Sequence, residues 1–124
     1  MNTNDTRPPV WVGHVAMYTP QVTDSSEFMQ LLGMRLVAGG DEFAVLEMRG
    51  GTHLVLTSDS ESTLIKGDFD LMVEDLDATH AYYTELGLDP GGIERGEIHY
   101  SFEMREPGGT VITFNSSHVG NLPV

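Results

Sequence analysis

The side chains best suited to chemistry in this sequence are His14 and Asp68, which stand 54 positions apart. An imidazole and a carboxylate can act together as a general base and the group that orients it, and both can bind a divalent metal ion. His53 and Glu103 are further donors that could complete a metal site. Because the chain has no cysteine, thiol nucleophiles, disulfides and thiolate metal sites are excluded.

The two candidate residues open two copies of one pattern. His14–Gly33 and Asp68–Gly87 align without a gap, and the Gly-Gly-Thr at 50–52 is repeated 58 positions later at 108–110. Half-domains of about 50 residues are too small to close a core alone, so the copies must pack on one another. We therefore expect the functional site to lie between them.

The repeat predicts one domain over residues 10–118, with a first module at 10–58 and a second at 67–118. Residues 1–9 and 119–124 are predicted to be tails, and a polar link joins the modules. The hydrophobic periodicity of each module predicts a strand, a helix and three strands. The expected class is α+β, with two tandem βαβββ modules and mixed sheets.

Each predicted helix has a polar cap at its start and a glycine at its end. The candidate caps are Thr23 or Asp24 in the first module and Asp75 or Asp77 in the second. Glu27 follows Asp24 at the spacing of a capping box, and Gly33 and Gly87 supply left-handed stops. The helix residues expected to face the sheets are Phe28, Leu31, Leu32, Leu76, Tyr82, Tyr83 and Leu86.

The predicted strands, of which the first spans 10–19, alternate between an apolar face and a mixed polar face. The apolar face should pack under the helices, and two polar faces turned toward one another would line a groove. The candidate ligand-binding residues on the polar faces are His14, Tyr18, His53, Asp68, Asp70, His99, Ser101, Glu103, Thr113 and Asn115.

Three other side chains are assigned no role in that groove. A turn centred on Gly50 would place His53 opposite Glu47, which we interpret as a structural cross-strand pair. His80 lies on a predicted helix and His118 in the tail, and both are expected at the surface.

Nineteen acidic residues against six basic ones give a formal net charge of -13. Such a chain repels phosphate backbones and anionic lipids, so neither nucleic acid nor a membrane is an expected partner. The charge would attract a cationic small molecule, although a solubilising surface explains it equally well. No apolar run reaches the roughly 18 to 20 residues of a membrane helix and no signal segment is evident, so we expect a cytoplasmic protein.

Three segments of the sequence resemble the vicinal oxygen chelate superfamily, which includes glyoxalase I, extradiol dioxygenases and bleomycin resistance proteins. They are HVAMYTPQVTDSSEFMQLLGM, DFDLMVEDLDATHAYYTELGL and REPGGTVITF. The resemblance covers about nine-tenths of the chain. It implies that the paired βαβββ modules form a cup, often within a homodimer whose cleft lies within one chain or between two.

The resemblance also implies metal-ligand positions at His14, Val55, Asp68 and Thr113. His14 matches the family's usual ligands and Asp68 could bind a hard ion, but Val55 has no donor and a neutral Thr113 hydroxyl is a poor ligand. A catalytic ion usually needs at least three protein ligands, so we favour no metal cofactor. A divalent ion held by His14 and Asp68 with Glu103 or His53 is the alternative.

Two functions follow from these observations. The first is a metal-free binding protein, similar to the bleomycin resistance proteins, that sequesters a cationic or aromatic small molecule in an acidic, partly aromatic cleft. The second is a superfamily enzyme, of the glyoxalase, epimerase or dioxygenase kind, that uses a shifted metal site or a His14/Asp68 acid-base pair. Sequence alone leaves open whether any reaction is catalysed and which ligand is bound.

Overall fold

The computed structural model describes residues 4–60, 66–117 and 121–124. The first module contains β1 (His14–Thr19), α1 (Val22–Leu31), β2 (Arg35–Gly39), β3 (Phe43–Glu47) and β4 (His53–Ser58). The second contains β5 (Lys66–Val73), α2 (Leu76–Glu85), β6 (Glu94–Arg95), β7 (Tyr100–Arg105) and β8 (Val111–Ser116). The predicted α+β fold of two βαβββ modules with mixed sheets is confirmed.

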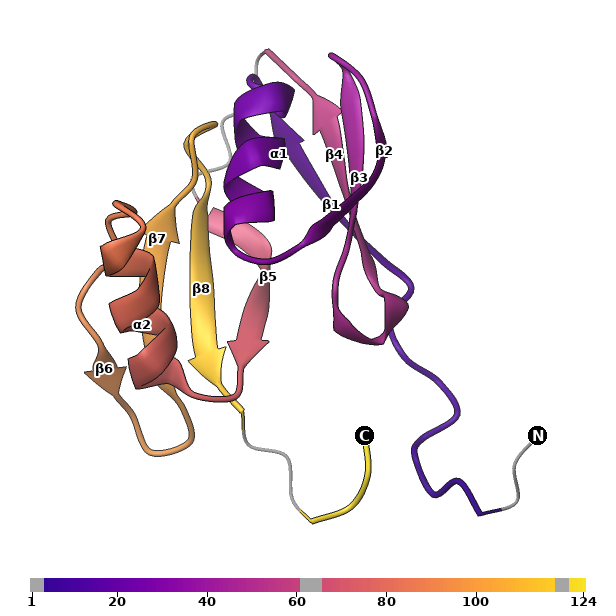
Figure 1. Ribbon diagram of the computed structural model, residues 1–124, viewed down its shortest axis with the longest axis vertical. Helices are drawn as coiled ribbons and strands as arrows, with labels where there is room; N and C mark the ends of the chain where they lie inside the picture. Colours follow the sequence, from indigo (N-terminus) through magenta and orange to yellow (C-terminus); the bar gives the residue numbers. More distant parts are fainter. Residues whose placement is uncertain (1–3, 61–65, 118–120) are drawn as a thin grey trace.

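The first strand of each module pairs in parallel with the last strand of the same module. The first sheet has the order β1-β4-β3-β2, and the second has the equivalent order β5-β8-β7-β6. Figure 1 shows both helices on the same side of their sheets, with β1 and β5 at the centre of the molecule and β2 and β6 at the outer edges. The two modules therefore meet along their first strands.

The strand faces that lie under the helices form the core, as their alternation predicts. The buried apolar strand residues are Met17, Ala44, Leu46, Leu54, Leu56, Phe102, Met104, Ile112 and Phe114. Phe102 and Phe114 stack with ring centroids 4.9 Å apart, and Tyr83 of α2 packs edge-on against both rings. The opposite face of each sheet carries no helix, which leaves its polar side chains accessible.

The predicted cap of the first helix is wrong. α1 begins at Val22, so Asp24 lies in its first turn and cannot form a capping box with Glu27. Gln21 is the cap residue, and its backbone N–H donates to Thr19 Oγ1 over 3.1 Å. Gln21 makes no side-chain capping hydrogen bond, and the Thr19 hydroxyl accepts from the N–H of the cap residue itself rather than from a backbone N–H of the first turn of the helix.

The predicted cap of the second helix and the predicted glycine stops of both helices are confirmed. Asp75 caps α2 and accepts a hydrogen bond from the Ala78 backbone N–H over 3.0 Å. Gly33 and Gly87 follow the helices with φ of 112° and 82°, which is the left-handed region that favours glycine.

Three of the apolar helix residues do not face the sheets. Leu31, Tyr82 and Leu86 are exposed, whereas Leu76 and Tyr83 are buried. Leu76 and Tyr83 are seven positions apart and so share one face of the helix, while Tyr82 and Leu86 lie on the neighbouring face that meets solvent.

The first strand is shorter than predicted. Residues 10–13 lie outside β1 because its partner β4 begins only at His53, which pairs with His14. Trp11 in this segment is 70% exposed, so it is not part of the core.

His80 was expected at the surface, but it is partly buried. Its Nε2 lies 2.8 Å from the Gly91 carbonyl oxygen, and its ring packs edge-on against Phe102. His118 and residues 61–65 of the link lie outside the described residues. In the described part of the chain, neither helix is long and apolar enough to cross a membrane.

Candidate functional site

The polar face of the first sheet brings His14 and His53 together. They are neighbours in the β1–β4 ladder, with ring centroids 5.6 Å apart. His53 Nε2 lies 3.2 Å from Glu47 Oε2 on β3, which confirms the predicted cross-strand pair. Glu47 also forms an ion pair with Arg35 at 2.9 Å. A carboxylate in this position fixes the orientation of an imidazole, so His53 is the oriented histidine of the pair.

The polar face of the second sheet holds two hydrogen-bonded pairs. Thr113 Oγ1 donates to Glu103 Oε2 over 3.4 Å, and Asn115 Nδ2 donates to Asp70 Oδ2 over 2.5 Å. Ser101 lies opposite Asn115 in the β7–β8 ladder. Ser101, Glu103 and Thr113 also line a small cavity of about 300 Å³. Five of the predicted binding residues are therefore neighbours on this sheet.

The remaining predicted residues are dispersed. Tyr18 and Asp68 are exposed, and His99 Nδ1 lies 3.1 Å from the Ser116 carbonyl oxygen. In the part of the chain that the structure describes, no hydrogen bond joins His14 to Asp68. The binding role of the ten residues stays a prediction.

The positions implied for metal ligands do not fit a metal ion. Val55 offers no donor atom, and the Thr113 hydroxyl donates to Glu103. Among the described residues, no three His, Cys, Asp or Glu side chains are grouped so that they could hold an ion. His14 and Asp68 alone fall short of the three protein ligands that a catalytic site requires.

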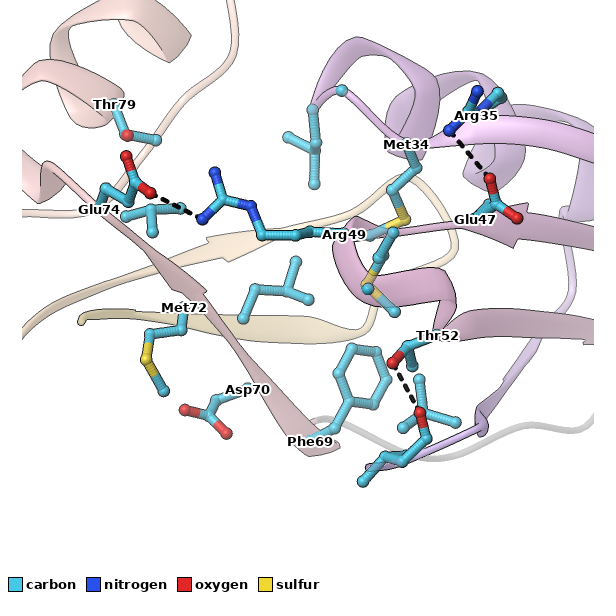
Figure 2. Close-up of a pocket in the computed structure, with 18 of the residues that line it drawn as sticks. Met34, Arg35, Glu47, Arg49, Thr52, Phe69, Asp70, Met72, Glu74 and Thr79 are labelled. Atoms are coloured by element: carbon cyan, nitrogen blue, oxygen red, sulfur yellow. Dashed lines mark hydrogen bonds and ion pairs between the residues drawn. The ribbon is translucent and has the colours of Figure 1, made fainter. Parts of the chain in front are cut away.

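A cavity of about 1010 Å³ lies between the two modules (Figure 2). It is bounded by the end of α1, the turn at Arg49–Gly51, β5 and α2. Its apolar wall includes Val15, Met34, Met48, Phe69, Leu71 and Val73. Its charged lining consists of Arg35, Glu47, Arg49, Asp70, Glu74 and Asp75. Of the ten predicted binding residues, Asp70 alone lines this cavity.

Two interactions join the modules around the cavity. Figure 2 shows Arg49 extending from the β3–β4 turn to Glu74 just after β5, with Nη1 and Oε1 2.8 Å apart. Both side chains are exposed, so this ion pair contributes little stability. On the other side, the Tyr83 hydroxyl donates to the Leu32 carbonyl oxygen over 3.4 Å. Burial raises the pKa of the Tyr83 phenol, and nearby Tyr82 adds to the effect.

The modules also meet at a second place, where they are closely packed. Glu106 precedes the β7–β8 turn and is 1% exposed. Its Oε1 accepts a hydrogen bond from Ser25 Oγ of α1 over 2.5 Å, and its Oε2 accepts one from the Thr110 N–H over 2.9 Å. Thr19 Oγ1 lies 2.8 Å from Ser25 Oγ. Gly108 fits here because a Cβ on it would lie 2.1 Å from Thr19 Oγ1.

Sequence reasoning predicted that the modules pack on one another but did not single out the residues of either meeting place, although the repeat contained a signal for them. The offset of 58 that aligns the two Gly-Gly-Thr turns also aligns Glu106 with Met48. A carboxylate and a thioether at equivalent positions cannot make the same contacts. The contact made by Glu106 in the second module therefore has no equivalent at Met48 in the first.

The fold and these sites can be compared with known proteins. No protein-family model matches the chain, and no curated protein matches it. The lactoylglutathione lyase from Agrobacterium tumefaciens has a similar structure, with a TM-score of 0.73 and 16% identity over 90% of this chain and 96% of that chain. The predicted resemblance is confirmed at the level of the fold, which is that of the vicinal oxygen chelate superfamily.

Two further solved structures extend the comparison. A glyoxalase/bleomycin resistance protein/dioxygenase from Alicyclobacillus acidocaldarius is 20% identical, with a TM-score of 0.68 over 92% of this chain and 96% of that chain. Oxidase ChaP-H2 is 15% identical, with a TM-score of 0.69 over 91% of this chain and 98% of that chain. The same architecture thus carries different described activities, and function must be argued from the site.

Proposed function

We propose that this protein binds a small organic molecule in the cavity between its modules and does so without a resident metal ion. The observation that carries the proposal is the cavity of about 1010 Å³, which matches the upper end of the volumes typical of ligand pockets. Its wall is apolar and its charged groups lie around that wall, as in sites that bury a ligand body and orient it by a few polar contacts.

The charges that line the cavity favour a ligand with a positive group. Arg35 and Arg49 are each paired with a carboxylate, Glu47 and Glu74 respectively. Asp70 accepts its hydrogen bond from the neutral amide of Asn115. The lining therefore keeps an excess of negative charge, and the chain as a whole carries a formal charge of -13. Both would raise the affinity and the association rate of a cation.

A titration with ethidium, a flat aromatic cation, tests this proposal. We expect ethidium to bind at low salt and to bind more weakly as salt is added, because the attraction is screened. Asp70→Asn should weaken binding, whereas Asp89→Asn, the same change at an exposed carboxylate outside the cavity, should leave it unaltered. Absence of ethidium binding, or equal affinity of the two variants, would contradict the proposal.

A proton-transfer enzyme is the second candidate, and the contact between His53 and Glu47 favours it. An imidazole held by a carboxylate is the usual arrangement of a general base, and His14 lies beside it. A screen of oxygen-rich compounds would first identify a substrate that the wild type turns over. Loss of that turnover in both His53→Ala and Glu47→Gln would support this function. Turnover that persists in both variants would remove these residues from the mechanism.

Elemental analysis separates the metal-free and metal-dependent forms of either function. We expect no stoichiometric ion in the purified protein, and no thermal stabilisation on addition of manganese, iron, cobalt, nickel or zinc. A bound ion that stabilises the fold and is lost in His14→Ala would establish the shifted metal site instead.

A further inference from the structure

The cavity and the closely packed Glu106 contact occupy equivalent places in the two halves of the molecule. The offsets of the repeat align Glu106 with Met48, Thr19 with Val73, and Ser25 with Thr79. The first member of each pair belongs to the packed contact, which we call the closed junction. The second members all line the cavity, which we call the open junction. The cavity is thus one of two equivalent junctions.

The closed junction is held by polar groups of both modules. Glu106 of the second module accepts a hydrogen bond from Ser25 of the first, and Thr19 completes the cluster. All three residues are buried, and no buried polar side-chain atom in the described residues lacks a partner. Such a satisfied cluster resists separation of the modules, because opening it would leave buried polar groups without their partners.

The open junction has lost every element of that cluster. Met48 has a thioether in place of the carboxylate, and a thioether accepts hydrogen bonds only weakly. Val73 has no hydroxyl at the place of Thr19. Thr79 keeps its hydroxyl but donates it to the Asp75 carbonyl oxygen within its own helix, over 2.7 Å. None of these three side chains joins the modules, which are linked around the cavity by the Arg49–Glu74 ion pair and the Tyr83–Leu32 hydrogen bond. The part of the lining that Met48 and Val73 contribute is apolar.

We infer that a bound ligand adds a tie between the modules at the open junction, in the place where the closed junction has its polar cluster. Its apolar body fills the space between Met48, Val73 and Phe69, where the closed junction has its buried carboxylate. The ligand is therefore an aromatic or aliphatic molecule that turns an uncharged surface inward and contacts both modules at once. This inference rests on the proposed function and adds to it the chemistry of the buried part of the ligand and the effect of binding on the modules.

Transplanting the closed junction into the open one tests the inference. The variant Met48→Glu/Val73→Thr/Thr79→Ser places all three groups of the closed junction at the equivalent positions. We expect it to bind phenanthridine, the uncharged analogue of ethidium, at least about tenfold more weakly, because a carboxylate and one additional hydroxyl now occupy the apolar space. The control Met48→Leu, which keeps the wall apolar, should bind as the wild type does. Equal affinity of the triple variant and the wild type would overturn the inference.

Competition with the uncharged analogue phenanthridine and with the small cation tetramethylammonium tests whether the apolar body or the charge of ethidium determines its binding. We expect phenanthridine to displace ethidium, and tetramethylammonium at the same concentration not to displace it. Only phenanthridine has an apolar surface large enough to fill the space between the modules. The opposite order would show that charge alone holds the ligand, which contradicts the inference and leaves the proposed function in place.

A distance measurement tests the tie without altering the cavity. Because the chain has no cysteine, spin labels can be attached uniquely in the variant Glu27→Cys/Glu85→Cys, which places one label on each helix (Figure 1). We expect ethidium to narrow the distribution of label distances, since it joins the modules. A distribution unchanged at saturating ethidium would overturn the tie, whereas absence of ethidium binding to the wild type would reject the proposed function itself.

Discussion

The closed and the open junction are built from equivalent positions of a repeat, but one is filled by a buried carboxylate and the other encloses a cavity. At the closed junction, Glu106 has lost contact with water and is held by Ser25 and the Thr110 N–H. At the open junction, Met48 and Val73 line the space without joining the modules. The difference shows how duplication can assign stability and ligand binding to different junctions. The closed junction holds the modules together, so the residues of the open junction can vary to suit a ligand.

The largest effect should come from removing the carboxylate of the closed junction. Glu106→Ala leaves the buried Ser25 hydroxyl and the Thr110 N–H without an acceptor, so we expect a loss of about 3 kcal/mol in the free energy of unfolding, measured by urea denaturation. Glu106→Gln retains one acceptor oxygen and should lose about half as much. A loss below about 1 kcal/mol in Glu106→Ala would show that this junction does not hold the modules together.

The two equivalent glycines of the turns offer a matched comparison. Gly108→Ala places a Cβ 2.1 Å from Thr19 Oγ1, and we expect a cost of about 2 kcal/mol. Gly50→Ala has open space, so its cost of about 1 kcal/mol comes from the φ of +80° alone. Thermal denaturation of both variants measures the difference, and a greater loss in Gly50→Ala would reverse the assignment of open and closed junctions.

Exchanging the wall residue of the open junction should be tolerated. In Met48→Glu the new carboxylate can reach the solvent in the cavity, so we expect the free energy of unfolding to fall by less than about 1 kcal/mol. The reciprocal change, Glu106→Met, should cost several times as much because the site is buried. Similar losses in the two variants, measured in the same urea series, would mean that the junctions do not differ in packing.

The smallest effect concerns Tyr83 beside the open junction. Burial raises the pKa of this phenol above its ordinary value, so the folded state binds the proton more tightly than the unfolded state does. Its contribution to stability is complete below the unfolded pKa of about 10 and is lost as the pH rises through the folded pKa. An absorbance titration at 295 nm should show one late-titrating tyrosine that is missing in Tyr83→Phe, and a wild-type curve identical to that of Tyr83→Phe would contradict the prediction.

The fold could be predicted because its signals are local or repeated. Gly33 and Gly87 end their helices in the conformation that the sequence predicts, and the alternation in 100–105 separates the buried Phe102 and Met104 from the exposed Glu103 and Arg105. The failures arise where tertiary contacts decide. The capping box at Asp24 is absent because α1 already begins at Val22, after a turn in which the buried Thr19 hydroxyl accepts from the Gln21 N–H.

The candidate site was predictable only in part. Strand parity places His14 and His53 on one face, and the turn places Glu47 beside them. Parity says nothing of how the two sheets are inclined to each other, and that inclination decides where a cavity lies. The thioether of Met48 and the carboxylate of Glu106 carry no motif, so their roles emerge only from comparison of the two junctions.

The hydrogen-bonded ladders have a practical consequence. In the described part of the chain, the backbone–backbone hydrogen bonds do not cross from residues before 61 to residues after 65. A polypeptide cleaved between residues 60 and 66 therefore keeps each ladder on one fragment, while neither fragment of this size can close a core unaided. Two such fragments, fused to separate proteins, would fold only when brought into proximity, and their reassembly would report that the fused partners had met.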